Sequence, residues 1–197
     1  MTVKEEPRIL TPRQREGRAV NAVAELLRQT LSVPNIYLEP PSPLIAADVL
    51  AVDRAGAGDL HAVEIKLESD LRPFNGSWEK PTTSKEIKQM HATWYPRFSE
   101  KIRGIHRQLM AMPAHFRYLA ITVESFPLVF GELAGFGLFP ADGIGRLGVI
   151  LIAERTGSPP EASLSVVPER FRMDPTKLKS IETRLLAKSR PDIEVRI

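Results

Sequence analysis

The chain has 197 residues, 43% of them apolar and 26% charged, a balance typical of a globular protein rather than a disordered segment. The absence of cysteine excludes disulfides and thiolate zinc sites and favours a cytoplasmic location. The charged N-terminus does not resemble a signal peptide, and the apolar runs are too short to span a membrane. We therefore expect one domain over residues 1–197, with no membrane contact.

Positive charge is concentrated in one part of the chain. The net charge is +3, but the segment from Arg72 to Tyr118 contains nine lysines and arginines and only three acids. Both tryptophans lie in the same segment. Interleaved basic and aromatic residues are typical of nucleic-acid-binding surfaces, where cations meet phosphates and rings meet bases. The alternative is a basic surface helix whose aromatic side chains face the core.

The first predicted element is a helix that follows a loose arm of residues 1–10. Thr11 can cap this helix, Pro12 suits its first position, and Gln14 completes a capping box. Apolar residues at helical spacing define the stripe expected to be buried (Val20, Val23, Leu27 and Leu31).

Three strands are predicted next. "NIYLE" (35–39) is a short strand, and the runs "LIAADVLAVD" (44–53) and "LHAVEIKL" (60–67) are joined by the glycine-bearing turn "RAGAGD". This arrangement predicts a β-hairpin. The polar stretch at 68–83 is expected to be a loop.

A long helix is predicted from about Ser84 to Met112, with a break or kink at Pro96. The remaining segments indicate a buried strand at 116–125 and a later strand pair at 147–154 and 163–167. The segment 175–189 indicates an amphipathic C-terminal helix. The order of helix, three strands, helix, strand and further elements predicts one mixed α/β domain.

The triplet Glu-Ile-Lys occurs twice, and its context differs between the two copies. Glu86 follows Thr83 by three residues just before the long helix, which is the spacing of a capping box. Glu64 instead lies in a strand, where it shares one face with Lys66 while apolar residues take the other. A carboxylate in such surroundings is costly to bury unless it is paired or bound to a cation. Lys66 alone could be that pair.

The predicted hairpin selects an acidic partner for Glu64. If the turn is centred near residues 56–57, Glu64 lies across from position 48 or 49, which brings Asp48 close to it. Asp53 would pair near Leu60, about 13 Å from Glu64 at the rise of a strand. Asp48 is therefore the better partner, unless a bulge shifts the register.

Glu16 is a further acidic candidate. It precedes the apolar stripe of the first helix at helical spacing, so it could extend over the sheet towards the same site. Alternatively, it is a partly exposed glutamate favoured by the helix dipole. The sequence leaves both readings open.

The phrases "AADVLAVD" and "HAVEIK", with Glu16 on the preceding helix, resemble the PD-(D/E)xK nuclease superfamily over about residues 11–124. The resemblance implies a restriction-endonuclease-like αβββαβ core, a mixed central sheet flanked by helices, with extra strands and a helix over 125–197. Ala47 stands before the aspartate where the superfamily motif has proline. The same phrases are similar to those of small bacterial MmcB-like DNA-repair proteins, although the long basic segment before Tyr118 departs from them.

What the resemblance implies is a metal-dependent nuclease, with DNA as the expected substrate, acting in repair or defence. Asp48 and Glu64 would ligate Mg²⁺ or Mn²⁺ with help from the Ile65 carbonyl, and Glu16 would complete the metal environment. Lys66 would orient the attacking water or stabilise charge, with a pKa depressed by partial burial and the nearby cation.

The basic helix is expected to contact the substrate. Arg97 and Lys101 are four residues apart, as are Arg103 and Arg107, so each pair shares a side of the helix. Gln108 could approach the candidate site, or it could simply be exposed.

Two other functions are compatible with the sequence. The chain could be a nucleic-acid-binding module on the same fold without catalysis. It could also be a protein-interaction domain whose helix at 175–189 docks onto a partner or a second copy, which leaves a homodimer open.

Overall fold

A computed structural model describes residues 10–31, 34–38, 47–53, 58–71, 83–135, 144–155 and 157–188. The described elements occur in this order: α1 (Pro12–Thr30), β1 (Pro34–Leu38), β2 (Val49–Asp53), β3 (Asp59–Lys66), α2 (Glu68–Leu71), α3 (Ser84–Ala111), β4 (Phe116–Thr122), α4 (Phe126–Gly135), β5 (Ile144–Gly145), β6 (Gly148–Ala153), β7 (Glu161–Pro168) and α5 (Pro175–Lys188). No helix in these ranges is long and apolar enough to cross a membrane.

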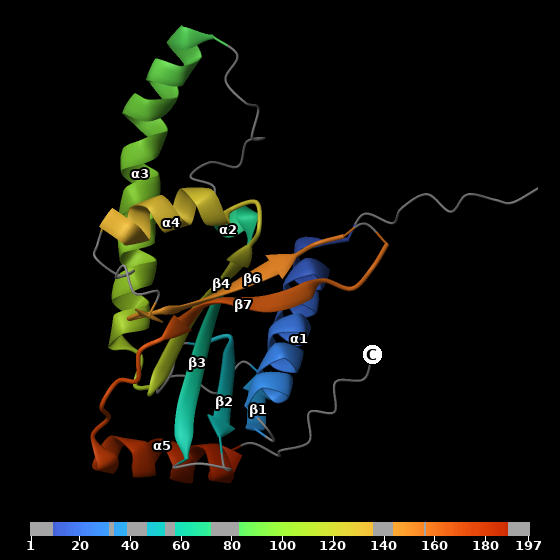
Figure 1. Cartoon of the computed structure of the whole chain (residues 1–197), viewed down its shortest axis with the longest axis vertical. Coiled ribbons are helices and arrows are strands. Elements are labelled where there is room, and N and C mark those ends of the chain that lie inside the picture. Colours follow the sequence, from blue (N-terminus) through green and yellow to red (C-terminus); the bar gives the residue numbers. More distant parts are fainter. Residues whose placement is uncertain are drawn as a thin grey trace, which may run out of the picture.

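The strands form one mixed sheet in the order β1-β2-β3-β4-β6-β7-β5, in which β5 has only two residues (Figure 1). β1 pairs antiparallel with β2. β2 pairs antiparallel with β3, which forms the predicted hairpin. β3 and β4 pair parallel, as do β4 and β6, and the chain crosses between them through α3 and α4. Parallel neighbours need such crossovers, which place helices on the faces of the sheet. The mixed α/β prediction is therefore confirmed.

Alternating side chains of the strands build a core on each face of the sheet. On one face, α1 packs its stripe of Val20, Val23 and Leu27 against Val63 and Ile65. On the other face, three helices pack against strand residues such as Leu50, Leu119 and Ile121. α3 contributes Phe98, Ile102 and Leu109, α4 contributes Val129 and Leu133, and α5 contributes Ile181. Side chains two positions apart therefore share a face, and Glu64 and Lys66 point to the α3 side.

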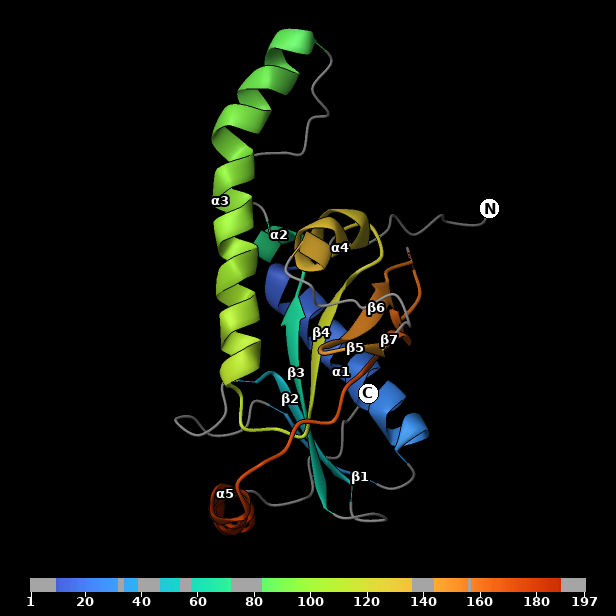
Figure 2. The same ribbon diagram turned by 60° about the vertical axis from the view of Figure 1, so that its left-hand side comes forward.

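The predicted helix starts agree with the structure. Thr11 caps α1, its hydroxyl accepts from the Gln14 amide at 3.3 Å, and the Gln14 side chain accepts from the Thr11 amide at 2.9 Å. α3 begins directly after Thr83, and its upper half extends beyond the sheet (Figure 2). α3 is continuous through Pro96, so the helix does not break there, and a kink at this residue stays a prediction.

Some segments differ from the sequence prediction or lie outside the described residues. Residues 68–71 form the short helix α2 instead of a loop, and α4 was not predicted. The arm at residues 1–9, the turn at 54–57 and the side chain of Glu86 are outside the described part of the chain.

Candidate active site

The β2–β3 hairpin sets the position of two acidic residues. Val49 pairs with Val63, and the Asp48 amide donates to the Val63 carbonyl at 3.0 Å, so Asp48 lies across from Glu64. Asp53 pairs with Asp59 at the other end of the hairpin. The predicted register, and with it the choice of Asp48 over Asp53 as the neighbour of Glu64, is confirmed.

The Asp48 carboxylate is held by the opposite strand. Its Oδ2 accepts a hydrogen bond from the backbone N–H of Ile65 at 2.6 Å. The Ile65 side chain belongs to the core on the α1 side, so only its backbone faces Asp48. Asp48 is thereby restrained beside β3, with its second carboxylate oxygen not used in this bond.

Glu64 is an enclosed carboxylate on the α3 side of the sheet, with 5% of its side chain exposed. Its Oε1 lies 2.5 Å from Lys66 Nζ, and its side chain also hydrogen-bonds to Gln108 of α3. Burial raises the pKa of Glu64, the hydrogen bond to Lys66 opposes this shift, and the charge of Asp48 adds to it. The surroundings of Glu64 therefore favour a cation.

In the structure, the cation beside Glu64 is the ammonium group of Lys66. Burial alone would lower the pKa of Lys66, but the hydrogen bond and charge of Glu64, with the charges of Asp48 and Asp70, outweigh burial and raise it. The predicted depression of this pKa depended on partial burial and on a bound divalent cation. Burial does lower the pKa, and the described residues around Lys66 add negative charge that raises it. The depression expected in the metal-bound state stays a prediction.

Asp70 is a charged neighbour of Lys66 that the sequence analysis had placed in a loop. It lies in α2, where its Oδ2 accepts from the Leu67 amide at 2.9 Å and so caps the end of β3. Its charge contributes to the raised pKa of Lys66. An acid four residues after the last residue of a strand is a signal for such a cap, but it does not reveal which side chain lies nearby.

Glu16 is not brought to these carboxylates by any described contact. It is exposed on α1, the helix that packs on the face opposite Glu64. The neighbouring Arg15 turns to the sheet instead, where its guanidinium pairs with Glu154 at the end of β6. Within the described ranges, no group of three or more histidine, aspartate or glutamate side chains is arranged to hold a metal ion.

The predicted nucleic-acid contacts lie on two different sides of α3. Arg97, Lys101, Arg103 and Arg107 are all exposed. Because each residue turns a helix by about 100°, Arg97 and Lys101 fall on the same side of α3 as Gln108, about 17 Å and 11 Å further along the helix. Arg103 and Arg107 lie about 120° further round, where they line a groove.

Comparison with known proteins adds no function. No protein-family model and no curated protein matches the chain. A solved structure of a protein of unknown function from Silicibacter pomeroyi is similar, with 17% sequence identity and a TM-score of 0.45, over 91% of this chain and 87% of that one.

Proposed function

We propose that the protein is a metal-dependent nuclease that hydrolyses phosphodiester bonds, with DNA as its first expected substrate. The observation that carries the proposal is the enclosed Glu64 carboxylate, which lies across from Asp48 and shares a face with Lys66. The element order from α1 to β4 is compatible with the αβββαβ core that the sequence resemblance implies. Arg97 and Lys101, exposed on the same side of α3 as Gln108, offer phosphate contacts along the helix from this centre.

The residues at the centre suit a hard divalent cation. The Asp48 and Glu64 carboxylates and the Ile65 carbonyl are oxygen donors, the type that Mg²⁺ and Mn²⁺ prefer. Burial penalises the charge of Glu64, and a bound cation would remove that penalty. When bound, the ion would supply Lewis acidity that activates water and neutralises charge on the phosphate.

The chain's own residues would prepare the site for this chemistry. The Ile65 amide restrains Asp48, and Gln108 and Lys66 restrain Glu64. Lys66 has three N–H donors, so it can turn one towards a phosphate oxygen or a water while another stays with Glu64. While charged, Lys66 can stabilise the negative charge that develops on the phosphate.

The test is cleavage of single-stranded, duplex and branched DNA in Mg²⁺ or Mn²⁺. Lys66→Gln removes the charge and keeps a hydrogen-bond donor for Glu64, so we expect the variant to fold. We expect its cleavage rate to fall by about 100-fold or more. Lys179→Ala, an exposed lysine on α5, is the matched control and should cleave normally. Wild-type rates in folded Lys66→Gln would contradict the assignment.

A second candidate function is nucleic-acid binding without cleavage. It is favoured by the Glu64–Lys66 ion pair, in which each group already satisfies the other without a metal. In this case the protein would bind DNA with a steep salt dependence, and no divalent ion would produce cleavage.

A further inference from the structure

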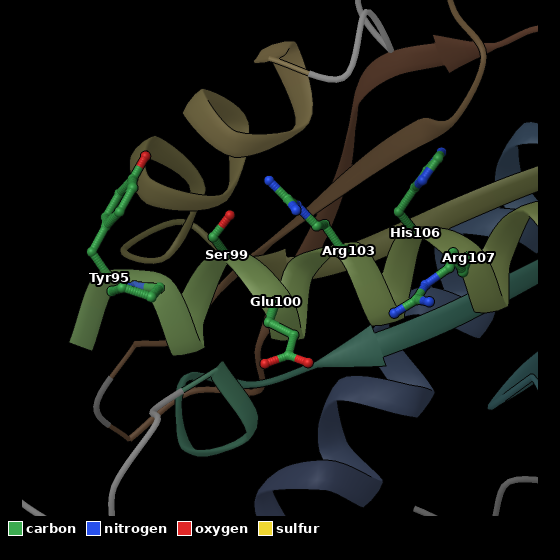
Figure 3. A pocket seen from close by; sticks show the side chains of 7 residues that line it. Tyr95, Ser99, Glu100, Arg103, His106 and Arg107 are labelled. Atoms are coloured by element: carbon green, nitrogen blue, oxygen red, sulfur yellow. The ribbon is translucent and has the colours of Figure 1, made fainter. Parts of the chain in front are cut away.

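α3 has a groove on the side that faces α4 (Figure 3). The groove has a volume of about 820 Å³, and its lining includes Tyr95, Ser99, Arg103 and His106. In Figure 3 these four side chains extend from α3 towards α4, while Glu100 and Arg107 extend to the opposite side of the helix. Tyr95, Ser99, Arg103 and Arg107 recur every four residues, so the groove follows the helix for about 18 Å.

This groove is distinct from the candidate active site. Ser99 and Gln108 are nine residues apart, which is two and a half helical turns, so they lie on opposite sides of α3. Gln108 contacts Glu64, whereas the Ser99 hydroxyl donates to Glu132 of α4 at 2.7 Å. The two sides of the helix therefore present two separate surfaces.

Tyr95 offers an oriented ring at one end of the groove. Its hydroxyl hydrogen-bonds to Glu132, which is itself buried and fixed by Ser99. The hydrogen bond to Glu132 raises the pKa of Tyr95, which keeps the hydroxyl protonated as a donor. With 46% of the residue exposed and its hydroxyl anchored, the ring can stack against a flat ligand without much loss of side-chain freedom.

The charges along the groove favour an anion. Arg103 and Arg107 are exposed and Glu100 is the one exposed acid among the described lining residues. Burial lowers the pKa of His106, so its ring is neutral at pH 7 and can still donate a hydrogen bond. A ring followed by two guanidinium groups matches a base and the phosphates next to it.

We propose that this groove binds a single strand of nucleic acid, with a base stacked on Tyr95 and phosphates on Arg103 and Arg107. A duplex fits less well, because its bases are stacked on one another and offer Tyr95 no free face. The inference rests on nucleic acid as the substrate class proposed above, but not on its cleavage.

The experiment measures binding of the full chain to a fluorescein-labelled oligodeoxythymidylate by anisotropy, in EDTA so that no cleavage occurs. Tyr95→Ala should weaken binding about fivefold or more, and Tyr95→Phe, which keeps the ring, should weaken it less. Arg103→Ala should reduce the slope of log K against log salt by about 0.7, the value for one lost phosphate contact on a single strand. Lys177→Ala removes one exposed charge from α5, away from the groove, and should change neither quantity.

Two further ligands test the identity of the occupant. A duplex of mixed sequence should bind with an affinity that Tyr95→Ala leaves unchanged. An equal loss for duplex and single strand would overturn the single-strand assignment, and so would full competition by a mononucleotide. Wild-type binding by both folded variants, Tyr95→Ala and Arg103→Ala, would contradict the proposal that the groove is the binding site. Each of these binding results can occur whether or not cleavage depends on Lys66. The binding experiment can therefore contradict the groove proposal without contradicting the nuclease proposal, and the cleavage experiment can do the reverse.

Discussion

His61 is enclosed in the core on the α1 side of the sheet, where its Nδ1 lies 2.9 Å from the Tyr118 hydroxyl and its ring stacks on Phe116. Burial lowers the pKa of His61 from 6.5 to about 4, against the opposing charges of Asp53 and Asp59. The native protein therefore holds this histidine neutral over a range in which an unfolded chain would protonate it.

This histidine should make the protein sensitive to acid. Between pH 6.5 and about 4 the unfolded state binds the additional proton, so stability is present above pH 6.5 and lost as the pH falls through this window. The lowered pKa of His61 contributes about 3 kcal/mol at most to the free energy of unfolding above pH 6.5. Urea unfolding at a series of pH values should show this loss for the wild type and a flatter profile for His61→Phe, which keeps a ring beside Phe116. Parallel profiles would mean that His61 titrates normally.

Local patterns predicted some residues of the candidate site better than others. Strand alternation put Glu64 and Lys66 on one face, and the hairpin length identified Asp48, because both rules act between near neighbours in the chain. The charge of Asp70 near Lys66 and the exposure of Glu16 depend on how α2 and α1 pack against the sheet. No spacing rule supplies that information.

At the scale of elements, Gly148 determines how closely β6 approaches β4. It pairs with Tyr118, and a Cβ added at Gly148 would overlap the Tyr118 ring and lie 3.0 Å from Pro168. The ring cannot easily move, because it is buried and its hydroxyl contacts His61. The absence of a side chain at Gly148 therefore allows this pair of strands to form.

Two glycine substitutions test this packing. Gly148→Ala should lower the free energy of unfolding by about 1–3 kcal/mol, the usual range for overpacking a core. Gly104→Ala, inside α3, has no atom within 4 Å of the added Cβ and should be neutral or stabilising by up to about 1 kcal/mol. Chemical denaturation of both variants gives the comparison. Equal effects would show that Tyr118 can give way.

The helices differed in how well the sequence predicted them. α1 was predictable because Thr11 and Gln14 form a capping box and its apolar residues follow one helical stripe. α4 was not predicted because Phe126–Gly135 is mostly apolar on its exposed as well as its buried positions and so shows little periodicity. Pro96 does not end α3, because a single proline removes only one hydrogen bond from the helix and the chain is helical on both sides of it.

At the scale of the whole molecule, residues 169–174 connect β7 to α5 and are tied to the lower end of the sheet. Arg170 pairs with Asp59 through bonds of 2.7 and 3.1 Å, and the Phe171 amide donates to the His115 carbonyl at 2.8 Å. The Arg117 guanidinium lies 3.9 Å from the centre of the Phe171 ring. These contacts hold the connection to α5 against the start of β3 and β4.

Loss of the Arg170–Asp59 pair should loosen this connection. We expect limited proteolysis to cut Arg170→Ala between residues 168 and 175 several-fold faster than the wild type. Arg172→Ala is a matched control, since Arg172 is exposed in the same connection and forms no ion pair with other described residues. Identical digestion of all three proteins would show that Phe171 alone secures the segment.

The overall arrangement followed from the sequence more readily than the surfaces did. The order of helices and strands predicted a mixed sheet, because parallel pairs require crossovers. The groove along α3 could not be foreseen, because Glu132, which holds Tyr95, belongs to α4, and α4 was not predicted. The nuclease activity and its metal stay predictions until cleavage is measured.

The bond between Asp48 and the Ile65 amide affects how loss-of-function data on this protein are read. The same carboxylate that would ligate a cation also joins β2 to β3. Asp48→Ala removes both roles, so an inactive phenotype in a genetic screen would not distinguish a lost ligand from a loosened hairpin. Asp48→Asn retains an oxygen acceptor for Ile65 while removing the charge, which makes it the informative allele at this position.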